Sequence, residues 1–231
     1  MNQPPFHGFI EVICGSMFSG KTEELLRRVK RAHIAKQKVQ LFKPALDNRY
    51  SEDHVQSHDA TRLPSISIQS AREILDLVED TTRIVGVDEA QFLDDSLVEI
   101  ADKLAYRGIR VIIAGLDMDY RGQPFGPMPK LLAIAEAVTK LTAVCTVCGG
   151  AATRSQRILE DAPAPQSNHQ GQNPILVGAL ESYEARCRFH HERDAVGVPA
   201  RQMGMPRART ETRPEKHPET RTEAPRPGAQ V

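Results

Sequence analysis

The clearest chemical signal in the sequence lies near its N-terminus, where residues 15–22 match the pattern G-x-x-x-x-G-K-[ST]. Its glycines let successive backbone N–H groups turn toward phosphate oxygens, Lys21 can reach the terminal phosphates, and the Thr22 hydroxyl can hold Mg²⁺. So short a pattern also arises by chance, but here an apolar run precedes it and a run with helical spacing follows it. The pattern therefore predicts a loop that binds a nucleotide through its phosphates. Its residues are Gly15, Ser16, Met17, Phe18, Ser19, Gly20, Lys21 and Thr22.

Two adjacent carboxylates, Asp88 and Glu89, follow the short apolar run 83–87. In phosphate-loop enzymes an Asp at the end of a strand orients the Mg²⁺ shell, and a neighbouring carboxylate can take a proton from the attacking group. On spacing alone the pair also fits a helix cap with a surface acid, but the phosphate loop favours the functional interpretation. Proton transfer from a hydroxyl to Glu89 would mean phosphoryl transfer to an alcohol, whereas orientation of water would mean hydrolysis. The spacing leaves both reactions open.

Two pairs of cysteine and histidine residues indicate a metal site in the second half of the chain. Cys145 and Cys148 form a CxxC pair, and after 38 intervening residues Cys187 and His190 form a CxxH pair. Three thiolates and one imidazole suit tetrahedral Zn²⁺, and four protein ligands leave no open position for a catalytic water. The pattern predicts a structural zinc site. His191 is the alternative fourth ligand, and a redox role of the CxxC pair is a weaker alternative because its usual strand-to-helix position is missing.

Short apolar runs alternate with amphipathic runs before the first of these cysteines. Strands are expected at residues 9–14, 39–43, 83–87, 111–115 and 141–144, and helices are expected directly after the phosphate loop, from near Ser70, from near Leu97 to Gly108, and over residues 129–138. This alternation predicts the α/β class, with a P-loop and a mostly parallel sheet flanked by helices on both faces. The polar stretch 45–64 is predicted to be a long loop. Cys14 falls inside the first strand, where a buried small hydrophobe is expected.

The composition changes twice along the chain and predicts three parts. Residues 1–144 form the expected P-loop nucleotide-binding domain, and residues 145–195 form a small zinc-binding module. The zinc ligands enclose residues 151–184, so the metal can hold this segment over a ligand as a substrate cover. Residues 196–231 are rich in proline and charge with almost nothing apolar, and are predicted to be a disordered tail.

Overall composition argues against two classes of partner. The 231 residues contain 30 Lys and Arg and 30 Asp and Glu, so no global charge favours nucleic acid or a membrane surface. No run approaches the roughly 18 apolar residues of a membrane-spanning helix. Residues 1–7 are polar and lack the pattern of a secretory signal, so a cytoplasmic location is expected.

Taken together, the chain resembles the type II thymidine kinases, the zinc-containing branch of the deoxynucleoside kinases, over residues 8–193. The resemblance rests on several motifs in a fixed order. They are the phosphate loop 15–22, Lys43-Pro44 with residues 47–50, and the segments 87–92, 115–117, 124–126, 140–145 and 181–188. The middle of the zinc-enclosed segment, residues 162–170, departs from the usual pattern.

The resemblance implies ATP-dependent phosphorylation of the thymidine 5′-hydroxyl, giving the monophosphate and ADP. Glu89 would then be the general base, Lys21 and Thr22 would contact phosphate and Mg²⁺, and Asp88 would belong to the Mg²⁺ shell. Asp47 and Arg49 would lie near the phosphates and metal. The remaining implied residues line the thymidine pocket, the last two in a zinc-anchored "lasso" over the base. They are Met17, Phe92, Leu116, Phe125, Thr142, Tyr183, Leu176 and Gly178.

The family further implies a homotetramer, feedback inhibition by thymidine triphosphate, ATP with Mg²⁺ and a structural Zn²⁺. The alternative function is a P-loop ATPase or switch whose zinc module binds nucleic acid or protein. That function would favour a basic, aromatic-lined module. Here the module is mixed in charge, which favours the kinase. Its charged residues include Arg154, Arg157, Arg186 and Arg188 against Glu160, Asp161, Glu181 and Glu184.

Overall fold

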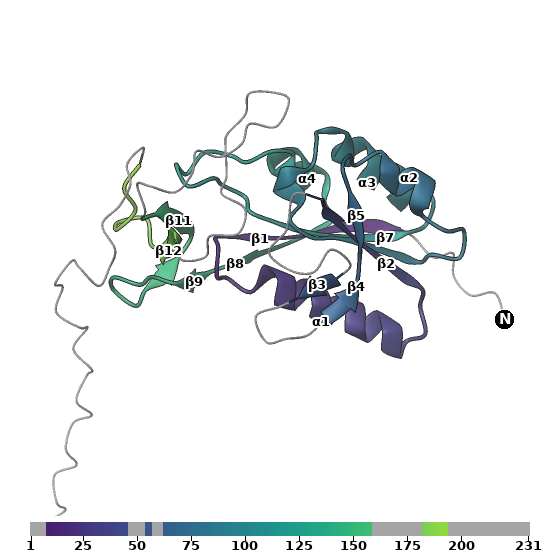
Figure 1. The fold of residues 1–231 in the computed structure, drawn as a ribbon, viewed down its shortest axis with the longest axis horizontal. Helices are drawn as coiled ribbons and strands as arrows, with labels where there is room; N and C mark the ends of the chain where they lie inside the picture. The colour runs from purple at the N-terminus through teal and green to yellow at the C-terminus, as the bar shows by residue number, and fades with distance from the viewer. Residues whose placement is uncertain (1–7, 46–53, 57–61, 159–181, 194–231) are drawn as a thin grey trace, which may run out of the picture.

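A six-stranded sheet forms the centre of the molecule in the computed structural model, which describes residues 8–45, 54–56, 62–158 and 182–193. The strand order is β5-β2-β6-β7-β1-β8, and every neighbouring pair is parallel. Figure 1 shows the sheet with helices above and below it. This arrangement confirms the predicted class. The strands are β1 (Phe9–Gly15), β2 (Val39–Pro44), β5 (Ile66–Ile68), β6 (Ile84–Val87), β7 (Arg110–Gly115) and β8 (Ala137–Leu141).

Helices cover both faces because the central strands are apolar on both sides. Along β1, Val12 packs into the cluster on one face of the sheet and Ile13 packs into the cluster on the other. Leu25, Leu26 and Val29 of α1 (Lys21–Ile34) cover the second face. The first face is covered by the remaining helices, as Figure 1 shows. They are α2 (Glu73–Leu77), α3 (Ser96–Tyr106) and α4 (Met128–Ile134).

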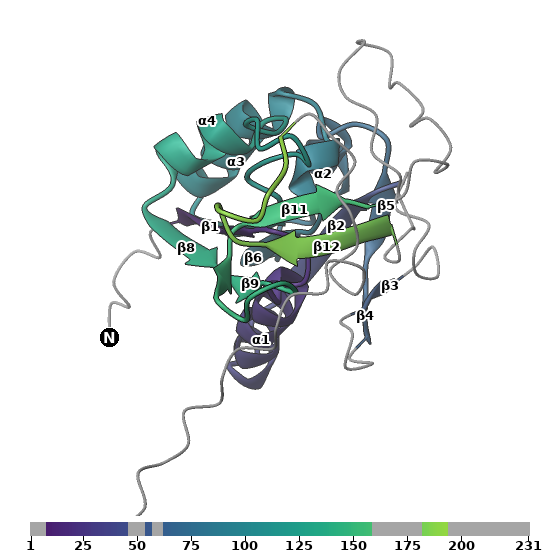
Figure 2. The same ribbon diagram turned by 90° about the vertical axis from the view of Figure 1, so that its left-hand side faces the viewer.

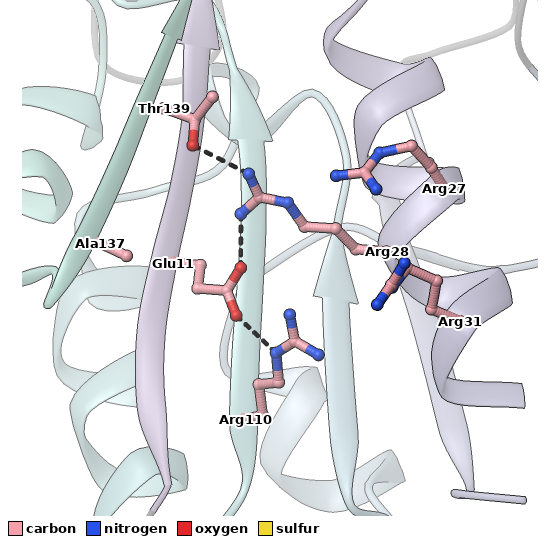
Figure 3. Close-up of a pocket in the computed structure, with 7 residues that line it drawn as sticks. All are labelled: Glu11, Arg27, Arg28, Arg31, Arg110, Ala137 and Thr139. Atoms are coloured by element: carbon pink, nitrogen blue, oxygen red, sulfur yellow. Dashed lines mark hydrogen bonds and ion pairs between the residues drawn. The ribbon is translucent and has the colours of Figure 1, made fainter. Parts of the chain in front are cut away.

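An ion cluster fixes α1 against the sheet. Glu11, on β1, receives hydrogen bonds from Arg28 of α1 and Arg110 of β7, and Arg28 also donates to the Thr139 hydroxyl at 2.8 Å (Figure 3). These side chains line an open pocket of about 540 Å³ beside the sheet. Glu11 is only 5% exposed, and the two arginines compensate its buried negative charge. The cluster therefore joins three elements around the helix that begins at the phosphate loop.

The boundary between α4 and β8 differs from the sequence-based prediction. The helix was expected over residues 129–138 with a strand at 141–144, whereas α4 ends at Ile134 and β8 begins at Ala137. Glu136 joins the sheet instead, because its N–H donates to the Ile10 carbonyl at 3.1 Å and its carboxylate accepts the Ile10 N–H at 2.7 Å. Pairing with β1 therefore ends the helix early.

The polar stretch 45–64 also contains regular structure that the sequence analysis did not predict. β3 (His54–Gln56) and β4 (Arg62–Pro64) pair as antiparallel strands, and β5 follows at the edge of the sheet. Each has three residues, too few for an alternating pattern to stand out. The predicted helix from near Ser70 is present as α2, after a turn in which the Glu73 carboxylate accepts the Ser70 N–H at 2.9 Å.

Four short strands, the first of them at residues 143–144, form the zinc module. Figure 1 shows the module at one end of the sheet, and Figure 2 shows its two longer strands side by side. The four strands pair as two antiparallel ribbons around a small core of Ala143, Cys145, Ala152 and Ala185. Among the described residues, no helix is long and apolar enough to cross a membrane. The domain boundary at 144/145 stays a prediction, and the tail 196–231 lies outside the described residues. The strands are β9 (Ala143–Val144), β10 (Ala151–Ala152), β11 (Arg154–Arg157) and β12 (Tyr183–Arg186).

Candidate functional site

The phosphate loop connects the end of β1 to the start of α1, as the sequence predicts. Gly15 has φ 146°, and a Cβ there would lie 2.4 Å from the Leu141 carbonyl oxygen of β8. Gly20, directly before α1, has φ 83°, in the left-handed region that favours glycine. Both glycines are therefore required by the backbone. The loop ends at the N-terminus of a 14-residue helix, where N–H groups and the helix dipole favour anions.

Lys21 folds back over this loop. Its Nζ donates to the Ser16 carbonyl oxygen at 2.8 Å, and the residue is 8% exposed. The Ser19 hydroxyl donates to the same carbonyl at 2.8 Å. The positively charged Lys21 ammonium group is thus held at the centre of the turn, where it can balance phosphate charge.

Thr22 and Asp88 meet although they lie 66 residues apart in sequence. The Thr22 Oγ1 donates to Asp88 Oδ2 at 3.0 Å, and the Asp88 N–H donates to the Phe42 carbonyl at 2.9 Å, which fixes the end of β6 beside β2. A hydroxyl and a carboxylate are oxygen ligands of the kind that Mg²⁺ prefers. The residue pair therefore fits the predicted metal site between the loop and the end of β6.

Glu89 follows Asp88 and has a left-handed backbone, with φ 50° and ψ 39°. Its N–H donates to Asp88 Oδ1 at 3.0 Å, and its carboxylate accepts a hydrogen bond from the side chain of Gln91. Gln91 belongs to the 3₁₀ turn η1 (Ala90–Phe92) and is 3% exposed. Sequence analysis did not identify Gln91, because nothing in its spacing predicts that its side chain points toward Glu89.

Apolar residues of the predicted nucleoside pocket lie in η1 or in contact with it. The rings of Phe92 and Phe125 meet edge to face, with centroids 5.9 Å apart. Leu116 is 6% exposed and donates its N–H to the Gln91 side chain at 2.9 Å. The structure thus joins Phe92, Phe125 and Leu116 to the segment that carries Glu89.

The other predicted pocket residues are placed as follows. Met17 is half-buried in the phosphate loop, Thr142 is exposed after β8, and Tyr183 is buried in β12. Their roles as pocket residues stay predictions. Four predicted site residues lie outside the described residues. These are Asp47, Arg49, Leu176 and Gly178.

The four predicted zinc ligands converge. The ligand atoms of Cys145, Cys148, Cys187 and His190 all lie within 4.8 Å of one another. Nδ1 of His190 is 3.2 Å from Sγ of Cys187 and 3.8 Å from Sγ of Cys145. Ligands bound to one tetrahedral Zn²⁺ at about 2.0–2.3 Å have separations of this size. His191 points elsewhere, with Nε2 2.8 Å from the Tyr120 carbonyl oxygen.

The chemistry of Cys145 also fits a metal ligand. Burial opposes ionisation of the Cys145 thiol, but hydrogen bonds from backbone N–H groups, including that of Cys187, outweigh it and lower its pKa to about 6. The thiolate is the form that binds metal. Cys14 behaves differently: it is 1% exposed, and burial raises the pKa of its thiol to about 11. This confirms the prediction that Cys14 acts as a small hydrophobe.

The zinc module also contacts the phosphate loop, which the sequence did not predict. The Met17 N–H donates to the Ser155 hydroxyl of β11 at 3.0 Å, and the Ser16 hydroxyl donates to the Ala152 carbonyl of β10 at 3.3 Å. Ser155 is 4% exposed. Two strands of the zinc module therefore hold the first half of the loop.

Comparison with known families agrees with this arrangement. The thymidine kinase family model matches residues 8–191. The match includes the phosphate loop, the Asp88–Glu89 pair and all four residues of the cysteine–histidine cluster. We conclude that the chain belongs to the thymidine kinase family, whose members are kinases.

Proposed function

We propose that this protein is an ATP-dependent thymidine kinase, which transfers the γ-phosphate of ATP to the 5′-hydroxyl of thymidine and gives thymidine monophosphate and ADP. The observation that carries the proposal is the hydrogen bond between Thr22 and Asp88, with Glu89 next in sequence, in a chain of this family. These groups stand where a phosphate loop and an acidic strand end meet, as phosphoryl transfer requires.

The phosphates of ATP would bind at the loop 15–22. Lys21 supplies a positive charge inside the turn, and the N-terminus of α1 supplies N–H groups. Thr22 and Asp88 would hold Mg²⁺, which neutralises charge on the phosphate oxygens when bound. Arg49, which lies outside the described residues, is proposed to contact the phosphates.

Glu89 would act as the general base. The thymidine 5′-oxygen forms a bond to the γ-phosphorus and its proton passes to the Glu89 carboxylate, while the bond between that phosphorus and the oxygen bridging to ADP breaks. The Glu89 backbone is left-handed, and the bond from Gln91 holds the Glu89 carboxylate next to the η1 turn. Phe92 and Phe125, on that turn and facing it, would contact the base.

The zinc module would hold the nucleoside rather than carry out chemistry. Cys145, Cys148, Cys187 and His190 would bind one structural Zn²⁺ and fix the strands from which the 159–181 segment departs and returns. Leu176 and Gly178 in that segment would cover the base, with Asp47 nearby. The other proposed contacts are Met17, Leu116, Thr142 and Tyr183. The homotetramer and inhibition by thymidine triphosphate are further proposals from the family.

The test is release of ADP from ATP and Mg²⁺ by the purified protein, with and without thymidine. Deoxycytidine, deoxyadenosine and deoxyguanosine serve as matched acceptors. We expect ADP only with thymidine, in equal amount to thymidine monophosphate. ADP release that is the same with every nucleoside and with none would contradict the proposal and favour a P-loop ATPase.

A further inference from the structure

The side chain of Gln91 bridges two strand ends of the site. Its Nε2 donates to Oε2 of Glu89, which follows β6, and its Oε1 accepts the N–H of Leu116, which follows β7, at 2.9 Å. The residue is 3% exposed, so water does not compete freely for either bond. One buried amide therefore ties the proposed general base to the backbone beside the proposed nucleoside pocket.

The two partners, Glu89 and Leu116, determine the orientation of the Gln91 amide. A carboxylate only accepts hydrogen bonds, and a backbone N–H only donates them. If the Gln91 amide were reversed, its NH₂ group would face the Leu116 N–H and its oxygen would face the Glu89 carboxylate. Both contacts would then be repulsive, so the donor must face Glu89.

The Gln91 side chain and backbone both pack closely against neighbouring glycines. A Cβ at Gly115 would lie 2.9 Å from Oε1 of Gln91, and a Cβ at Gly126 would lie 2.5 Å from its carbonyl oxygen. The two glycines thus make room for Gln91 on both sides. Glu89, in contrast, has φ 50°, a conformation that non-glycine residues adopt infrequently and that its surroundings must hold.

We propose that Gln91 is a positioning residue for Glu89. It donates to one carboxylate oxygen and so holds the carboxylate in the direction from which it accepts the proton of the acceptor hydroxyl. Its second bond, from the Leu116 N–H, fixes the Gln91 amide, and through it the Glu89 carboxylate, relative to the end of β7. The inference rests on the proposed role of Glu89, and it adds a residue that acts through that base without touching the reacting atoms.

Two substitutions distinguish the bond from Gln91 to Glu89 from the bond between Gln91 and Leu116. Gln91→Met keeps the length of the side chain and removes both. Gln91→Glu keeps an acceptor for the Leu116 N–H but sets a second carboxylate against Glu89. We expect both variants to lower kcat by about 10- to 100-fold, the cost of a misplaced reacting group, with the KM for ATP unchanged. Wild-type kcat in Gln91→Glu would overturn the inference, because the donor to Glu89 would then be dispensable.

Gln40→Met is the matched control. Gln40 also uses both ends of its amide, donating to the Leu77 carbonyl at 2.9 Å and accepting the Glu79 N–H at 2.9 Å, but these partners are remote from the site. Thermal unfolding of both Met variants shows how much stability each lost amide costs. A kcat loss in Gln40→Met equal to that in Gln91→Met would mean that Gln91 matters only for stability, and would overturn the inference.

A double-mutant cycle with Glu89→Gln is the decisive experiment. If Gln91 acts through Glu89, then Gln91→Met lowers kcat in the wild-type background and has no further effect in the Glu89→Gln background. If the two losses multiply in the double variant, the inference fails while the role of Glu89 stands. If Glu89→Gln alone keeps near-normal kcat, the proposed base is wrong, and Gln91 as its positioning residue falls with it.

Discussion

The sheet and the zinc module are held together by different forces. The phosphate-binding groups stand at the ends of buried parallel strands, and the clusters on both faces of the sheet contain most of the buried apolar residues. The zinc module has a core of four small residues, three of them alanine, around its ligand cluster. So little buried apolar surface cannot order a module of this size, whereas a bound metal can. The difference indicates that burial of apolar residues orders the sheet half, and we expect metal binding to order the zinc module, the proposed cover of the nucleoside.

The sheet half and the zinc module are not independent, because hydrogen bonds connect them. Ser155 of the zinc module holds the Met17 N–H of the phosphate loop, and His191 contacts the Tyr120 carbonyl in the loop that leads to Phe125. Loss of order in the module is therefore expected to reach the phosphate loop, but only through individual hydrogen bonds.

The largest effect is expected from Glu89→Gln in the sheet half. The amide keeps the shape of the side chain and removes its ability to accept a proton, so kcat should fall by about 10²- to 10⁴-fold. Steady-state kinetics of thymidine phosphorylation measures the loss, and equilibrium ATP binding serves as the control. ATP affinity should stay near that of the wild type. A near-normal kcat would remove Glu89 from the chemistry.

The next largest effect is expected on the stability of the sheet half, from a substitution of Glu11. Glu11→Gln removes the charge between Arg28 and Arg110, so the free energy of unfolding should fall by about 3 kcal/mol, as for other broken buried ion pairs. Chemical denaturation measures this loss. Zinc content should not change, because the cluster is remote from the metal ligands. An unchanged midpoint would mean that the ion cluster does not stabilise α1 on the sheet.

In the zinc half, the neighbouring histidines provide a matched pair. His190→Gln removes a ligand, so bound zinc should fall well below the expected content of about one ion per chain, while His191→Gln should keep it. Metal analysis after dialysis against a weak chelator distinguishes them. Equal zinc loss in both variants would contradict the assignment of His190 as the fourth ligand.

The smallest effect is expected at the contact between the halves. Ser155→Ala leaves the Met17 N–H without its partner, which should cost about 1 kcal/mol and raise the KM for ATP about fivefold. Ser155→Thr keeps the hydroxyl and is the control. If both variants bind ATP like the wild type, the zinc module does not support the phosphate loop through Ser155.

Local patterns predicted much of the site. Short motifs predict the loop 15–22, the Asp88–Glu89 pair and the four candidate zinc ligands, and the structure brings Thr22 to Asp88 and gathers the four cysteine and histidine residues. The alternation of apolar and amphipathic runs likewise predicted the parallel sheet with helices on both faces. These features depend on neighbours in the chain or on a repeating topology.

The features that the sequence did not predict depend on register between distant strands. The early end of α4 follows from pairing of Glu136 with Ile10, and β5 has only three residues. The bridge of Gln91 to Leu116 requires the ends of β6 and β7 to be level, and the bond of Ser155 to Met17 requires the zinc module to rest on the loop. No periodicity encodes such contacts.

The most direct test of the comparison is a titration of the wild-type protein with a zinc chelator, in which ATP binding and thymidine binding are measured separately at each step. We predict that thymidine binding is lost as zinc is removed, while ATP binding weakens by no more than about fivefold, the expected cost of losing the contact between the halves. Loss of both in parallel would contradict this prediction, because the phosphate site would then depend on the metal. Retention of thymidine binding by the zinc-free protein would also contradict it.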